Sequence, residues 1–310
     1  MSAKSDLFTR LEYLDEAIKN PALISTDIAM TPHNGSANLL RKGLGIVAFN
    51  ILEDFIKNKT QETLDNISNT GISFSDLSEK LQTASTLGAL NALKFRADLE
   101  KKNNGNWQQL IHEESLKIYS STSEGNFALS KFSLLSSGSN VTPKEVIDTI
   151  STFGISGGWT KLQNISDKIN AGVLRLDESY KNASSRRHKS AHTVNFLYQY
   201  TWLEAIKKEI LAISASFDIL LSARIRQIKN NTSLPMNNHN IDDELKYRYL
   251  KKDIVRRRIV YKEKVDITGR SRRNWDNLQN AISTLKPNLS QNNEFLIILD
   301  TSGSLIDWHE

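Results

Sequence analysis

Residues 203–228 read LEAIKKEILAISASFDILLSARIRQI, and this stretch decides the fold class. Its apolar side chains recur at every third or fourth position, as they do on one face of an α-helix. They are Leu203, Ile206, Ile210, Ile213, Phe217, Leu220 and Ile228. The pattern predicts a long helix from His192 to Lys229 that buries this face against other helices.

The chain before this stretch shows the same helical spacing of apolar residues. It predicts helices over residues 7–19, 36–66, 76–100, 107–119 and 160–182. Thr142, Pro143 and Glu145 are typical of a helix start, with proline in the first turn and an acid soon after. Gly43 and Gly45 are unfavourable inside a helix, so we expect another element to pass very close to them.

The pattern changes after residues 230–240, an asparagine-rich stretch with Pro235 that resembles a linker. A strand is expected at Ile259–Ile267, a helix at Asn274–Leu285, and a short buried strand at Phe295–Leu299. The predicted fold class is therefore mainly α: a helical domain over 1–229, a linker over 230–240, and a small α/β appendage over 241–310.

Composition excludes several classes of protein. The chain has no cysteine, which rules out disulfides and thiolate metal sites. The first predicted helix carries charged residues where a signal peptide needs an apolar core. No stretch is long and apolar enough to cross a membrane. We expect a cytoplasmic protein without membrane contact. Motifs for nucleotide cofactors are absent, so no cofactor is predicted.

The positive charge is concentrated in one segment. Residues 246–273 hold twelve Lys or Arg and three acids, a net +9, while the whole chain has a formal charge of +5. Such a stripe faces a polyanion, an acidic partner or water. We favour nucleic acid, bound through Arg256, Arg257, Arg258, Arg270, Arg272 and Arg273. Bases could stack on Tyr247, Tyr249, Tyr261 and Trp275.

The strongest candidate for chemistry is the segment from Arg187 to His192. Arg187 can hold a phosphate with two hydrogen bonds, and histidine exchanges protons near neutral pH. We expect His192 to begin a helix that Ser184 or Ser185 caps, with the helix N-terminus as an added anion site. His188 shares a face with His192 if both are helical. Cleavage of RNA by its own 2′-hydroxyl needs such groups as acid, base and phosphate clamp.

Three further features have both a functional and a plainer interpretation. Arg186 could support the phosphate clamp or be solvated. Glu53 could tune the histidine or be a structural acid. His188 and His192 have a zinc-like spacing but lack further ligands nearby, so no metal is predicted. Residues 300–304, Asp-Thr-Ser-Gly-Ser, match a divalent-metal motif of von Willebrand A domains, but we expect only a strand that runs into a turn.

Two segments together resemble the HEPN superfamily of ribonucleases. Arg187 to His192 resembles its Arg-x4-6-His motif, with His188 as the frequent polar residue after the arginine. Asn38 to Thr63, with Leu52, Glu53 and Phe55, resembles the second helix of the RiboL-PSP-HEPN branch. The similarity covers about residues 5–228. The long region over 67–158 departs from a minimal bundle.

The resemblance implies a four-helix-type bundle, often a homodimer in which two Arg-His motifs meet. It also implies a metal-independent endoribonuclease, commonly a toxin or phage-defence effector with an antitoxin or other partner protein. Arg187, His192 and His188 would be catalytic, with Arg186 and Glu53 in support. Some members have lost activity, so the alternative is a catalytically silent module that binds nucleic acid or a partner.

Overall fold

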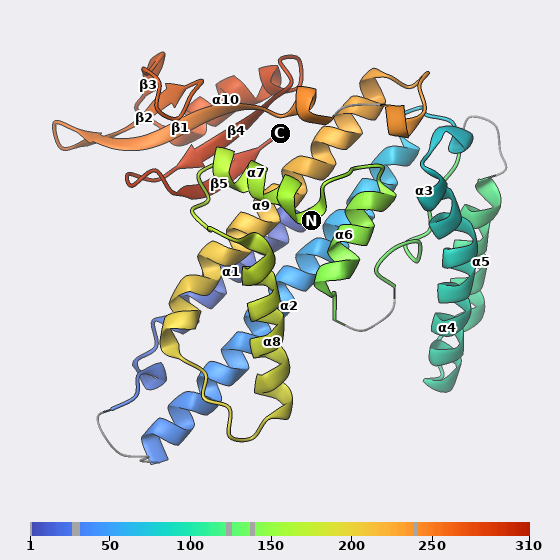
Figure 1. Ribbon diagram of the computed structural model, residues 1–310, viewed down its shortest axis with the longest axis horizontal. Coiled ribbons are helices and arrows are strands. Elements are labelled where there is room, and N and C mark those ends of the chain that lie inside the picture. Colours follow the sequence, from blue (N-terminus) through green and yellow to red (C-terminus); the bar gives the residue numbers. More distant parts are fainter. Residues whose placement is uncertain (1, 27–31, 122–125, 137–139, 239–240) are drawn as a thin grey trace.

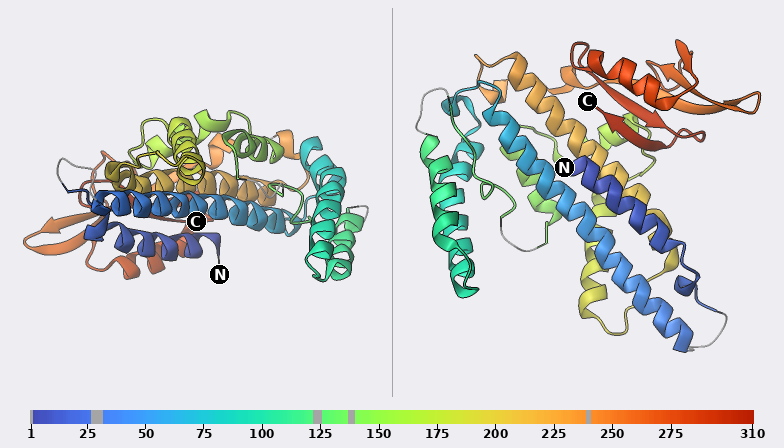
Figure 2. Two further views of the ribbon diagram at one scale, coloured as in Figure 1. Left: turned by 90° about the horizontal axis from the view of Figure 1, so that it is seen from below. Right: turned by 180° about the vertical axis from the view of Figure 1, so that it is seen from behind.

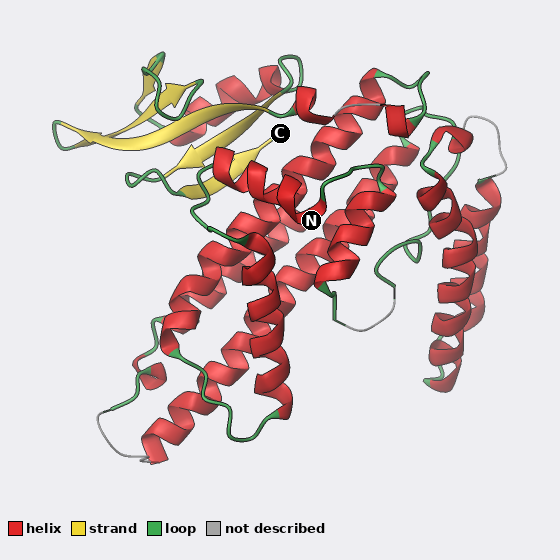
Figure 3. Ribbon diagram, viewed as in Figure 1, coloured by secondary structure: helices red, strands yellow, loops and turns green. Residues whose placement is uncertain are grey.

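The computed structural model describes residues 2–26, 32–121, 126–136, 140–238 and 241–310. It is mostly helical, with a five-stranded sheet at the C-terminal end (Figure 1, Figure 3). The mainly α fold class with a small C-terminal α/β part is therefore confirmed. None of the described helices combines the length and apolar composition that a membrane span requires.

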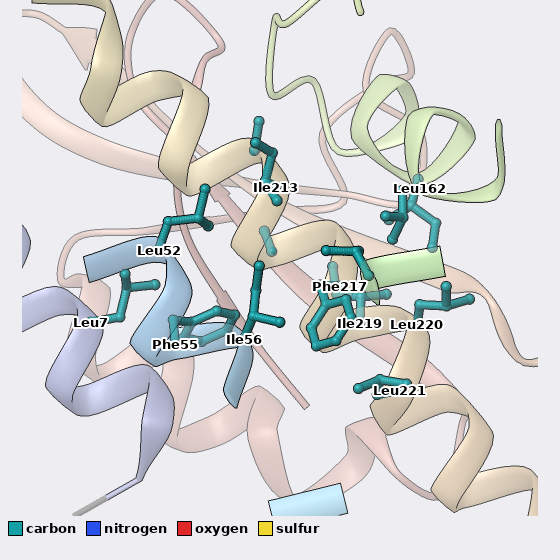
Figure 4. Packing of buried hydrophobic residues seen from close by; sticks show 14 of the residues in the cluster. Leu7, Leu52, Phe55, Ile56, Leu162, Ile213, Phe217, Ile219, Leu220 and Leu221 are labelled. Atoms are coloured by element: carbon teal, nitrogen blue, oxygen red, sulfur yellow. The ribbon is translucent and has the colours of Figure 1, made fainter. Parts of the chain in front are cut away.

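Four helices form the centre of the molecule. They are α1 (Ala3–Ile18), α2 (Pro32–Ser68), α8 (Leu176–His192) and α9 (Tyr200–Asn230). Helix α2 contacts each of the other three. Leu52, Phe55 and Ile56 of α2 meet Ile213 and Phe217 of α9 in the core (Figure 4). The apolar periodicity of these segments therefore predicted the faces that become buried.

The segment between α2 and α8 adds smaller helices. They are α3 (Glu79–Thr83), α4 (Ala89–Lys102), α5 (Trp107–Ser120), α6 (Pro143–Thr152) and α7 (Gly158–Lys168). A π-helical turn, Ala84–Gly88, joins α3 to α4, and α4 and α5 form a hairpin beside the main bundle (Figure 2). The predicted helix start at Thr142 is confirmed as a capping box with Glu145. Short 3-10 turns are η1 (Pro21–Leu23), η2 (Phe74–Asp76), η4 (Met236–Asn238) and η5 (Ile241–Glu244).

The C-terminal sheet has the strand order β3-β2-β1-β4-β5. Its strands are β1 (Lys246–Val255), β2 (Arg258–Lys264), β3 (Arg273–Trp275), β4 (Glu294–Leu299) and β5 (Leu305–His309). Only β1 and β4 are parallel neighbours among the described strands, and α10 (Leu278–Leu289) connects β3 to β4. The predicted strands at 259–267 and 295–299 correspond to β2 and β4, whereas β1, β3 and β5 were not predicted.

The two faces of the sheet bury different side chains. Tyr247, Tyr249 and Ile297 point toward the helices and belong to the same core cluster as α1, α2 and α9. Leu250 and Leu296 point the other way and pack with α10. Since successive strand residues alternate between faces, one sheet contacts both the helical bundle and its own helix.

A buried ion pair joins α2, α9 and β5. The Lys59 ammonium lies 2.5 Å from Oδ1 of Asp218, and the indole nitrogen of Trp308 donates to Oδ2 of the same carboxylate at 2.7 Å. Burial opposes charge on Asp218, but Lys59 and Trp308 hold its pKa below the usual range. The pair therefore fixes the last described strand against the two long helices.

Two predicted helix boundaries are wrong. The helix expected over 160–182 stops at Lys168, because Asn170 and Gly172 adopt positive φ angles of 53° and 69°. A new helix, α8, begins at Leu176 and ends at His192, so it continues past the predicted end at residue 182. The helix expected from His192 begins instead at Tyr200.

The prediction of a close neighbour is confirmed for Gly45 and wrong for Gly43. A Cβ atom on Gly45 would lie 2.6 Å from Cζ and 2.8 Å from Oη of Tyr198, whereas a Cβ on Gly43 would meet nothing within 4 Å. Gly45 therefore allows the Tyr198 ring to lie directly on α2.

The described part of the predicted linker, 230–238, is not isolated from the helical bundle. Met236 is fully buried, and its carbonyl oxygen accepts a hydrogen bond of 3.2 Å from the Arg224 guanidinium of α9. The division into 1–229, 230–240 and 241–310 stays a prediction.

Candidate functional site at the end of helix α8

The Arg187–His192 segment forms the C-terminal end of α8, not the start of a helix. Ser184 and Ser185 lie inside this helix, so neither can cap an N-terminus there. A helix C-terminus carries partial negative charge and unpaired carbonyl groups. The predicted anion site from a helix N-terminus is therefore wrong, and any phosphate bound here must be held by side chains.

The loop after the motif, residues 193–199, is fixed to α2. The Asn38 amide donates to the Phe196 carbonyl at 3.1 Å and accepts from the Tyr198 amide at 2.8 Å. The Lys42 ammonium donates to the Thr193 carbonyl at 2.9 Å. These contacts hold the residues after His192 close to the N-terminal half of α2, with Lys42 beside the motif.

His188 and His192 lie together on the solvent-exposed face of α8. Their ring centroids are 4.8 Å apart, and the rings are tilted by 49°. The four-residue spacing on a continuous helix explains this contact, since such residues are neighbours on the helix surface. The structure thus gives His188 a definite place beside His192.

Arg187 lies on a different face of the same helix, together with the buried side chains of Tyr180 and Ala183. Its Nε is buried and makes no hydrogen bond with described residues, and its charge opposes the rise that burial causes in the pKa of Glu53. Five helical residues separate Arg187 from His192, which corresponds to about 140° around the axis. The helix therefore directs Arg187 toward α2 and the histidines toward solvent.

Glu53 is a buried acid of α2 with a defined structural partner. It accepts a hydrogen bond from the amide of Val141, whose carbonyl accepts one from the Tyr180 hydroxyl at 2.7 Å. Burial raises the pKa of Glu53, and the Val141 amide and Arg187 oppose this rise. No contact between Glu53 and either histidine of the motif is present in the described structure.

Arg186 turns toward α9. Its guanidinium lies 4.6 Å from the centre of the Trp202 ring, and its Nη1 is 3.9 Å from Oε2 of Glu209. Burial raises the pKa of Glu209, and Arg186 opposes this rise. Arg186 therefore lies in the packing between α8 and α9, on the protein side of the motif.

The predicted nucleic-acid residues lie on the C-terminal sheet and not beside the motif. Arg256, Arg257 and Arg258 form the exposed tip of the β1–β2 hairpin, and Arg270, Arg272 and Arg273 are exposed at its base. Of the four aromatic rings expected to stack bases, only Tyr261 is not fully buried, and it packs partly buried against the α10 cluster. Tyr247, Tyr249 and Trp275 are buried, and Arg273 covers the Trp275 ring at 3.8 Å.

The Asp-Thr-Ser-Gly-Ser match is a strand that runs into a turn, as expected. β4 ends at Leu299 and β5 begins at Leu305. Oδ1 of Asp300 accepts hydrogen bonds from the Ser302 hydroxyl at 2.6 Å and the Ser304 amide at 2.8 Å. Among the described residues, no three His, Cys, Asp or Glu side chains gather as a group that could hold a metal ion.

Asn38, Lys42 and the loop they hold were missed as parts of the site. Nothing in the sequence links Asn38 to Tyr198, because 160 residues separate them. Lys42 lies near the start of α2, in the segment Asn38 to Thr63 whose sequence indicated only the family resemblance. No family model, curated protein or solved structure matches the chain, so the relationship to the HEPN superfamily stays a prediction.

Proposed function

We propose that the protein is a metal-independent endoribonuclease whose proton-transfer groups are His188 and His192. The observation that carries this proposal is the contact of the two exposed imidazoles, 4.8 Å apart, in the last turn of α8. Imidazole is the side chain best suited to take and give protons near neutral pH. Positive charge near the pair comes from Arg187 and Lys189, which flank His188 in the sequence, and from Lys42, which donates to the carbonyl of Thr193.

The reaction would be transesterification. The 2′-oxygen forms a bond to phosphorus as its proton passes to one imidazole, and the bond from phosphorus to the 5′-oxygen breaks as that oxygen receives a proton. A 2′,3′-cyclic phosphate and a 5′-hydroxyl end result. Arg187, which the helix directs toward α2, must turn outward to bind the phosphate and neutralise its charge.

The contact between the rings also favours a shared site. Base and acid act on opposite sides of the phosphorus, but two rings in contact approach a phosphate from one side. A second copy of the chain in two-fold symmetry would supply the other pair, because such an interface is self-complementary. Leu39 and Val194, which are 70% and 89% exposed near the motif, offer apolar surface for this dimer.

The test is cleavage of a labelled RNA in the presence of EDTA by wild type, His188→Ala, His192→Ala and His112→Ala. His112 is an exposed histidine on α5 and serves as the matched control. We expect His192→Ala to abolish cleavage, His188→Ala to reduce it at least tenfold, and His112→Ala to match wild type. Mass spectrometry should find 2′,3′-cyclic phosphate ends.

Full activity of His192→Ala would refute the assignment. A purified protein that binds RNA but never cleaves it would favour the alternative, a silent binding module on the same bundle. For the dimer, restored activity on mixing His192→Ala with Arg187→Ala is expected if the two motifs form one site. Sedimentation that finds only monomer at active concentrations would exclude the shared site.

A further inference from the structure

The β1–β2 hairpin extends beyond the rest of the sheet. β4 pairs with β1 only as far as Lys251, and β3 pairs with β2 only as far as Tyr261. The residues from 253 to 260 pair only with each other, through three cross-strand pairs and a two-residue turn. Figure 1 shows this hairpin projecting from one end of the molecule. Three strand residues correspond to about 10 Å of free ribbon.

The turn of this hairpin is strained. Arg256 and Arg257 both have positive φ angles, 49° and 65°, which are the angles of a type I′ turn. Asn-Gly is the favoured sequence there, because side chains other than glycine and asparagine resist the left-handed region. Two consecutive arginines therefore cost stability, and strain of this kind is concentrated at functional sites.

The tip combines positive charge with exposed aliphatic groups. The carboxylate of Asp253 lies 2.5 Å from the Lys262 ammonium and is neutralised by it. Arg256, Arg257 and Arg258 are exposed without a carboxylate within ion-pair distance among the described residues. The cross-strand partners Ile254 and Ile259 are 62% and 50% exposed.

We propose that this hairpin is a finger that binds double-stranded RNA across its minor groove. Guanidinium groups of the tip contact phosphates on both sides of the groove, and the two isoleucines contact the riboses between them. The minor groove of A-form RNA is wide and shallow, so a short two-stranded ribbon can enter it. This inference rests on the proposed function in that it takes RNA as the polymer.

The structure favours a duplex over a single strand. Single-stranded RNA is bound by stacking its bases on exposed aromatic rings. The free ribbon, residues 253–260, contains no aromatic side chain. Of the rings beside it, Trp275 is buried under Arg273 and Tyr261 is partly buried against the α10 cluster. The finger and the histidine pair are also far apart, because the pair lies at the C-terminal end of α8, away from the sheet that carries the finger (Figure 1). A stiff duplex spans such a distance without loss of chain entropy.

The test replaces the arginines without damaging the turn. Arg256→Asn with Arg257→Gly gives the sequence that a type I′ turn prefers, so the variant should be at least as stable as wild type. Lys94→Gln with Lys102→Gln, two exposed lysines of α4, removes the same charge elsewhere. All proteins carry His188→Ala and His192→Ala to prevent cleavage, and anisotropy measures binding to a 20-base-pair RNA duplex.

We expect the turn variant to lose at least tenfold in duplex affinity and the lysine variant less than twofold. The dependence of affinity on salt should become shallower by about two released ions, one for each arginine. Ile254→Thr with Ile259→Thr, which keeps β-branched residues in the strands, should lower affinity severalfold with an unchanged salt dependence.

Four outcomes would overturn the inference. They are unchanged duplex affinity of the turn variant, equal affinity for single-stranded RNA of the same sequence, equal affinity for duplex DNA, and hairpin-dependent binding to phosphatidylserine vesicles in place of RNA. Because the assay measures binding by proteins without the histidines, it is independent of catalysis. Binding by the finger with no cleavage by wild type would refute only the ribonuclease proposal.

Discussion

Substitution of Gly45 by alanine tests the contact that holds the loop after the motif against α2. Alanine gains about 1 kcal/mol over glycine in a helix interior. At Gly43, where a Cβ meets nothing within 4 Å, only this gain applies. At Gly45 the Cβ would overlap the Tyr198 ring, and overpacking of this kind costs about 1–3 kcal/mol. We therefore expect Gly45→Ala to be less stable than Gly43→Ala by about 1–3 kcal/mol.

Urea unfolding followed by circular dichroism measures this difference in the free energy of unfolding. Gly43→Ala is a matched control, because it makes the same substitution in the same helix, α2. A cycle with Tyr198→Ala separates steric overlap from other effects: the penalty at Gly45 should vanish when the ring is absent. The penalty should also weaken the proposed activity, because the Tyr198 backbone is part of the loop beside His192. A Gly45→Ala protein as stable as Gly43→Ala would refute the close approach of the ring.

The structure predicts how three further substitutions change the stability of the fold. Glu53→Gln should gain stability relative to wild type as pH rises from about 4.5, because a buried acid with a raised pKa stabilises the fold only while protonated; a pH-independent difference in urea unfolding would contradict this. Asp218→Asn should lower the free energy of unfolding by about 3–5 kcal/mol, because it removes the nearest carboxylate from the buried Lys59 ammonium. Lys59→Met with Asp218→Leu should recover much of this loss, and an equal loss in both proteins would argue against the ion pair. Asn38→Ala removes two hydrogen bonds, about 2 kcal/mol, and should speed amide exchange in residues 193–199 but not in α5.

The long helices could be predicted because their burial repeats with the helical period. The buried residues of α2 follow the helical period, and the spaced apolar residues of α9 show the same period, although α9 is buried on all sides from Ile210 to Arg224. The start of α6 could be predicted for a local reason, since the capping box involves only Thr142 and Glu145. A helix start of this kind can be predicted because all the residues that form the cap lie within four positions of one another.

The break between α8 and α9 could not be predicted from local sequence. Residues 193–199 contain no glycine or proline, and Phe196 continues the apolar spacing of the following helix. The helix ends because the Asn38 side chain, from a distant part of the chain, takes the Phe196 carbonyl and the Tyr198 amide as partners. Ser184 and Ser185 were expected to cap a helix, but serine is tolerated inside a helix that tertiary contacts stabilise. The sequence thus indicated the Arg187–His192 motif but did not predict that it lies at the C-terminal end of α8.

Lys59, Asp218 and Trp308 are made at different times during translation. At about 5–20 residues per second, roughly 10–50 s pass between synthesis of Lys59 and of Trp308. During this interval the two long helices exist on the ribosome without the indole that completes their buried carboxylate. Lys4 of α1 is synthesised earlier still, and its partner Asp307, 2.7 Å away in the finished fold, is made just before Trp308. A chain that ends before residue 305 would hold the Lys59–Asp218 pair without the Trp308 indole and would leave Lys4 without Asp307.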